Sequence, residues 1–93
     1  MAEMHNPAHP GRILREWLGE MQVVEAAARL HVSRLTLSRI LNGKSGISAD
    51  MSLRLADALG TSPTLWIDLQ TQYDLWQASR KRHPRIERFE QAA

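Results

Sequence analysis

The sequence contains no cysteine. This absence excludes disulfide bonds, iron–sulfur clusters, thiolate zinc sites and cysteine nucleophiles. No apolar run approaches the ~18 residues that a membrane-spanning helix requires. The opening segment MAEMHNPAHP also lacks the basic and apolar regions of a secretory signal. We therefore expect a cytoplasmic protein that folds by packing alone and makes no membrane contact.

Acidic residues are missing from one long stretch. The whole chain carries twelve lysines and arginines against ten aspartates and glutamates, a net charge of only +2. Residues 26–49, however, contain no acid at all. The basic residues of this stretch are Arg29, Arg34, Arg39 and Lys44. Charge of one sign in one segment indicates a surface that binds an anion.

The length of 93 residues fits one domain, since domains average roughly 150 residues. Hydrophobic residues make up 43% and charged residues 24%, as in ordinary globular proteins. A chain of this size buries only about 60 to 70% of its unfolded surface, so contact with a second copy would add useful burial. The composition predicts one globular domain and favours self-association.

Apolar spacing predicts five helices and no strand, an all-α fold. A proline in the first turn at Pro10 starts the first helix, whose apolar face runs to Met21. The other predicted helices span residues 23–30, 34–41, 49–59 and 63–82. We expect residues 1–9 to form a loose arm and residues 83–93 a flexible basic tail around a domain of residues 10–82.

The expected helix ends follow from capping residues. Ser33 and Ser48 are suitable N-caps, and Ser62 followed by Pro63 is a similar signal for the last helix. A glycine at position 60 is expected in the left-handed conformation that ends a helix. These signals divide the chain into helices joined by short loops.

Two of these helices form a pattern that suits DNA. Residues 23–30 and 34–41 are separated by a three-residue break, and the small residue Ala27 permits a close crossing. In a helix-turn-helix, the second helix is held outward to enter the major groove. A helical wheel at ~100° per residue, drawn with Leu37 inward, leaves four residues outward. These are Leu35, Ser38, Arg39 and Asn42.

We expect double-stranded DNA to contact this outer face, the first turn of the helix and the loop that follows. The candidate residues are Ser33, Arg34, Leu35, Thr36, Ser38, Arg39, Asn42 and Lys44. Each arginine can pair bidentately with a guanine edge, whereas the lysine in its glycine-flanked loop suits a phosphate. For Leu35 two interpretations stay open, contact with a thymine methyl group or packing against a neighbouring loop.

The run ARLHVSRLTLSRILNGKSGIS resembles the helix-turn-helix of the Cro/repressor-like (XRE) superfamily. With HPGRILREWL before it and LRLADALGTSPTLWIDLQTQYDLW after it, the chain resembles the HigA-type antitoxins over roughly residues 9–76. The resemblance implies a homodimer that binds a palindromic operator, represses its own operon and neutralises an mRNA-cleaving ribonuclease toxin. The chain departs from the family pattern at His31, where glycine is usual, and at Val23, where glutamine is usual.

Aromatic residues are few, and three of the five lie on the last predicted helix. The apolar stripe on that helix consists of Trp66, Leu69, Tyr73 and Trp76. Aromatic residues are enriched in interface cores, so we expect this stripe to form the dimer interface. Within it, Trp66 and Leu69 are expected to point inward, and Tyr73 and Trp76 to be more available to a second copy. The basic residues after it are expected to add non-specific phosphate affinity.

Three other interpretations compete with an operator-binding antitoxin. The first is a protein-interaction module on the same scaffold that binds no DNA, which the arginines of the second motif helix disfavour. The second is a metal-dependent enzyme using His5 and His9, but a third ligand is not evident and Pro7 lies between them. The third is a stand-alone XRE-type repressor without a toxin. We expect no enzyme activity, no metal and no cofactor.

Overall fold

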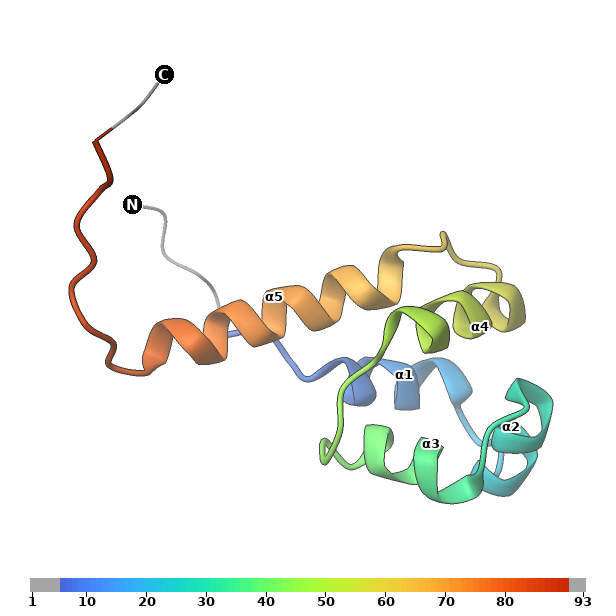
Figure 1. Ribbon diagram of the computed structural model, residues 1–93. Helices are drawn as coiled ribbons and strands as arrows, with labels where there is room; N and C mark the ends of the chain where they lie inside the picture. Colours follow the sequence, from blue (N-terminus) through green and yellow to red (C-terminus); the bar gives the residue numbers. More distant parts are fainter. Residues whose placement is uncertain (1–5, 91–93) are drawn as a thin grey trace.

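The structure is a computed structural model and describes residues 6–90. Within that part of the chain the secondary structure is five helices and no strand, as the sequence predicts (Figure 1). The helices are α1 (Pro10–Leu18), α2 (Val23–Leu30), α3 (Arg34–Leu41), α4 (Ala49–Leu59) and α5 (Leu65–Arg80). None of them is both long enough and apolar enough to cross a membrane.

Most of the predicted helix ends are confirmed. The Ser33 hydroxyl accepts a hydrogen bond from the Thr36 N–H, and the Ser48 hydroxyl does the same for Met51. Gly60 ends α4 with φ of 73°, the left-handed conformation that glycine adopts without strain. Local capping chemistry therefore sets the limits of α3 and α4.

Three predicted helix limits are wrong. The first helix ends at Leu18 rather than near Met21, because Gly19 turns the chain with φ of 60°. The last helix begins at Leu65 rather than at Pro63 and ends at Arg80 rather than near residue 82.

The start of α5 is stabilised from another helix. Ser52 of α4 donates a hydrogen bond to the Pro63 carbonyl (2.9 Å) and accepts one from the Ile67 N–H (3.1 Å). Ser52 is buried, and Thr64, the N-cap residue of α5, makes no side-chain capping bond. A tertiary contact therefore takes the place of the predicted Ser62 cap.

The core is built by one large side chain from each of four helices. Leu14, Leu37, Leu55 and Trp66 have no exposed surface. The indole N–H of Trp66 donates to the Thr61 hydroxyl at 3.1 Å, which satisfies its one polar group. Trp66 therefore points inward as expected. Because it has no exposed surface, it cannot contact a second copy, and its place in the predicted dimer interface is wrong.

Gly11 allows α1 to approach α3 very closely. A Cβ atom at this position would lie 1.9 Å from the carbonyl oxygen of Ile40, far inside any allowed contact. Glycine is thus required here by backbone packing rather than by backbone conformation. The contact sets the position of α3 against the rest of the domain.

The last residue of the predicted loose arm is not loose. His9 caps α1, with its Nδ1 accepting the Gly11 N–H at 2.9 Å, and its ring packs edge-on against Tyr73 at 4.9 Å. At the other end, residues 82–90 carry no helix and are exposed. Residues 6–8 of the predicted arm carry no helix, and the rest of the arm and tail, residues 1–5 and 91–93, lie outside the described residues.

Candidate nucleic-acid interface

The turn between α2 and α3 accepts a histidine where glycine is usual in the family. His31 adopts the left-handed conformation, with φ of 60° and ψ of 42°. The N–H groups of His31 and Val32 donate to the carbonyls of Ala28 and Ala27, which closes the end of α2 in a Schellman arrangement. A positive φ is costly for a residue other than glycine, and the two hydrogen bonds offset this cost at His31.

Arg54 of α4 holds this turn in place. Its Nη1 donates to the carbonyls of Leu30 and His31 at 2.9 and 3.0 Å, and its Nε pairs with Asp50 at 2.8 Å. The carbonyls at the end of a helix lack partners within it, and a cation there also complements the helix dipole. Arg54 was not among the residues singled out from the sequence, because its role depends on how α4 packs against α2.

The outward face of α3 is the one that the helical wheel predicts. Leu37, Ile40 and Leu41 are buried, and of the four residues predicted to face outward, Leu35, Arg39 and Asn42 are exposed and Ser38 is half-buried. Arg34 and Thr36 of the first turn are exposed as well. Leu35 is 68% exposed, so its side chain does not pack against a neighbouring loop. Its exposure favours the first interpretation, an apolar contact in the groove.

Several predicted site residues organise one another. The Ser33 hydroxyl caps α3 and lies 2.8 Å from the Thr36 hydroxyl, so Ser33 has a structural role. Asn42 donates to the Ser38 hydroxyl at 3.3 Å. The Arg39 guanidinium donates to the Lys44 carbonyl at 3.3 Å. These bonds join six of the eight candidate residues in three pairs on α3 and its following loop.

The loop after α3 is anchored to α5. The Gln70 side chain is 7% exposed, and its oxygen accepts the Ile47 N–H at 2.8 Å in the interior. Its amide nitrogen donates to Asp74 at 2.9 Å. At the other end of the loop, the Lys44 N–H donates to the Arg39 carbonyl at 2.8 Å. Bonds at both ends hold the position of Lys44 relative to α3.

Two further arginines extend the cationic surface onto α1. The Arg15 guanidinium donates to the side-chain oxygen of Asn42 at 3.4 Å. With Arg12 and His9, it lines an open hollow beside the end of α3. In the sequence these two arginines stand three residues apart, but Glu16 follows them and they lie outside the acid-free segment. Exposed arginines at this place suit DNA phosphates.

His9 contributes no fixed charge to this hollow. Desolvation by burial lowers the pKa of His9 below its usual value of 6.5, against smaller opposing effects of a bond to the Ser45 backbone and of the Asp74 charge. Its Nδ1 is also already used as the acceptor that caps α1. Among residues 6–90, no three His, Asp or Glu side chains are grouped to hold a metal ion, and His5 lies outside that range.

Comparison with known proteins agrees with this geometry. The family model described as Helix-turn-helix matches residues 12–66. Virulence-associated protein A' of Dichelobacter nodosus is 43% identical over 81 residues, which cover 84% of this chain and 70% of that protein.

Two solved structures are similar over most of their length. An addiction module antidote protein of the HigA family from Coxiella burnetii has a TM-score of 0.77 and 42% identity, covering 80% of this chain and 84% of that one. The Pseudomonas aeruginosa antitoxin HigA, solved with the higBA promoter, has a TM-score of 0.75 and 43% identity. The match covers 77% of this chain and 82% of that one. With its left-handed turn at His31 and its outward α3, the chain belongs to the XRE-type helix-turn-helix family and, within it, to the HigA-type antitoxins.

Proposed function

We propose that this chain binds a palindromic operator through α3, represses its own operon and neutralises a ribonuclease toxin. The observation that carries the DNA-binding part is the outer face of α3, where Arg34 and Arg39 are exposed within a stretch that holds no acid. Acidic neighbours would repel phosphates and compete for the guanidinium groups, and here there are none in the segment. The similarity to HigA antitoxins supports the rest.

Base recognition is assigned to the two arginines and Leu35, and phosphate contact to the residues around them. An exposed guanidinium pairs bidentately with a guanine edge, and an exposed leucine side chain suits a thymine methyl group. Lys44 in its loop and Arg12 and Arg15 on α1 flank α3, where the DNA backbone passes a helix inserted into the major groove. Phosphate contacts of this kind position the protein without reading sequence.

Operator recognition is proposed to require a dimer. A palindrome is read by two recognition helices about 34 Å apart on one face of the DNA. The exposed part of α5 is the surface we propose for contact between copies, with Tyr73 and Trp76 half-buried and Leu75 56% exposed. Leu69 packs against the core of its own copy and contributes only its exposed edge.

Operator recognition is tested by fluorescence anisotropy. One DNA duplex is taken from the promoter of the gene that encodes this chain, and the other has a scrambled sequence. Arg34→Ala and Arg39→Ala are each expected to weaken operator binding by about 1 to 3 kcal/mol. Lys44→Ala is expected to weaken both duplexes alike. Arg29→Ala is the matched control, because Arg29 is paired with Glu25 on α2. Unchanged operator affinity in both Arg34→Ala and Arg39→Ala would contradict the assignment of α3.

The antitoxin part is tested in cells. The toxin candidate is the protein encoded by the gene adjacent to that of this chain. Co-expression of this chain is expected to relieve the growth arrest that the toxin causes, and the two proteins are expected to purify together. Failure of both would leave the second candidate function, a stand-alone repressor.

A further inference from the structure

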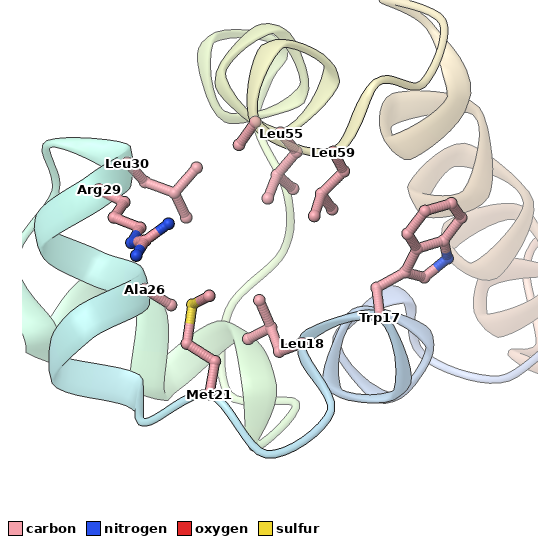
Figure 2. A pocket seen from close by; sticks show the side chains of 9 residues that line it. Trp17, Leu18, Met21, Ala26, Arg29, Leu30, Leu55 and Leu59 are labelled. Carbon is pink, nitrogen blue, oxygen red and sulfur yellow. The ribbon is translucent and has the colours of Figure 1, made fainter.

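An apolar groove opens between three helices on a part of the molecule that α3 does not reach. The end of α1, the turn after it, α2 and α4 line the groove, which has a volume of about 110 Å³ (Figure 2). The main apolar side chains are Trp17, Leu18, Met21, Leu30, Leu55 and Leu59. None of the candidate DNA-contacting residues lies in this lining. A space of this size accepts one apolar side chain of a partner.

The mouth of the groove leaves large apolar surface uncovered. Trp17 is 50% exposed and Met21 is 37% exposed. The inner edge of the Trp17 ring packs against the buried Trp66, with ring centroids 6.0 Å apart and the rings nearly perpendicular. Trp17 is therefore held by the core while half of it faces outward. A rigid, half-exposed tryptophan beside a hollow is the kind of residue that dominates binding energy at protein interfaces.

The charge around the groove is opposite to that of the α3 face. Glu16 and Glu20 are exposed and stand next to the lining residues Trp17 and Met21 in the sequence. Asp57 lines a neighbouring hollow that shares Arg29, Leu30 and Ala58 with the groove. Within residues 6–90 none of these three acids forms an ion pair. The arginine of the wall, Arg29, is already neutralised by Glu25 at 2.7 Å. Three exposed acids thus adjoin the groove, and we call them its acidic rim.

We propose that this acid-rimmed groove is the docking site of the toxin, and the proposal rests on the antitoxin function proposed above. A protein that cleaves RNA binds a polyanion and therefore carries a cationic surface. The acidic rim attracts such a surface, whereas the arginines of α3 repel it. An apolar side chain of the toxin enters the groove beside Trp17 and Met21. Because the groove and α3 share no residue, the antitoxin holds DNA and toxin at the same time.

The test measures toxin affinity in charge-reversed and groove-blocked variants of the full chain. The probe is the protein encoded by the adjacent gene, immobilised and titrated with this chain. Glu16→Lys with Glu20→Lys reverses the rim at two exposed positions, and its matched control, Glu87→Lys with Glu90→Lys, makes the same charge change on the exposed tail. Met21→Glu blocks the groove, and Leu53→Glu is its control on the exposed side of α4.

We expect both groove variants to lose at least tenfold in toxin affinity and both controls to bind like the wild type. Operator affinity and helical content are expected to match between each variant and its control. If Met21→Glu fails to fold, the variant with Glu16→Lys and Glu20→Lys still tests the proposal, because both positions are exposed and the changes leave the core intact.

Three results would overturn the proposal. The first is equal toxin affinity in the rim-reversed variant and in its control, which would show that the toxin does not bind at the groove. A change in oligomeric state of the groove variants without toxin would make the groove a contact between copies of this chain. A wild-type chain that neither binds the toxin nor relieves growth arrest would refute the antitoxin function itself, and the docking site with it.

Discussion

Replacing Gly11 with alanine is expected to destabilise the protein, although alanine is the better helix former. The gain in helix propensity is at most about 1 kcal/mol. Against it, the new Cβ would lie 1.9 Å from the Ile40 carbonyl oxygen and 2.8 Å from its carbon. Carbon and oxygen atoms normally approach no closer than about 3.3 Å, so α1 and α3 must separate by more than ~1 Å. Overpacking of this kind costs about 1 to 3 kcal/mol or more, and a backbone carbonyl cannot rotate away as a side chain can.

Because the clash is with a backbone carbonyl, the upper end of this cost applies, and the net loss of stability is expected to be about 2 kcal/mol. One kcal/mol lowers Tm by about 4 to 8 °C in a domain of this size. Thermal unfolding followed by circular dichroism, at equal protein concentrations, measures it. Gly60→Ala is the control, because its φ of 73° strains alanine but no atom lies within 4 Å of the added Cβ. Operator affinity provides the second measurement, since Ile40 belongs to α3 and only Gly11→Ala displaces that helix. A Gly11→Ala protein that melts at or above the wild-type temperature would refute the close-approach argument.

Three further predictions concern α5 and the start of α1. Gln70→Met removes the acceptor of the buried Ile47 N–H, which is expected to cost about 1 to 3 kcal/mol in urea unfolding, whereas Gln72→Met at an exposed position of the same helix is expected to cost nothing measurable. Trp76→Ala is expected to shift the dimer toward monomer in sedimentation equilibrium while the chain stays helical, and a fully dimeric variant would place the interface elsewhere. Because burial lowers the pKa of His9 in the folded state, its neutral form stabilises the protein fully above pH 6.5, and this contribution is lost as the pH falls through the lowered pKa. His9→Asn, which keeps a side-chain cap, is expected to show a smaller loss of Tm between pH 7.5 and about pH 5 than the wild type, and equal losses would contradict this role.

The helices of this protein were predictable where their signals are local. Ser33 and Ser48 cap the residues three positions ahead of them, so their effect depends on neighbours in the sequence alone. The last helix shows where such signals fail. Ser62 before Pro63 is a reasonable local cap, but the buried Ser52 of α4 binds the backbone at this place and the helix begins at Leu65. A tertiary hydrogen bond overrode the local preference.

The candidate DNA surface divides in the same way. With Leu37 set inward, the helical wheel placed Leu35 and Arg39 outside because a helix has one regular period, and the structure confirms both. The contribution of α1 escaped the sequence argument. Arg15 meets Asn42 across 27 positions of sequence, a proximity that depends on the packing of α1 against α3.

The sequence by itself determined the all-α fold, the helix-turn-helix and the acid-free outer face of its second helix, because periodicity, capping and charge are properties of neighbouring residues. Only the tertiary structure decided how that helix is held and what else the surface offers. Arg54 reaches the turn before α3 across 24 positions, and Gln70 reaches the loop after it across 23. The groove beside Trp17 exists only where three helices meet, and the acids that adjoin it come from α1, the turn after α1 and α4. Such contacts depend on the relative placement of helices, which local sequence patterns do not specify.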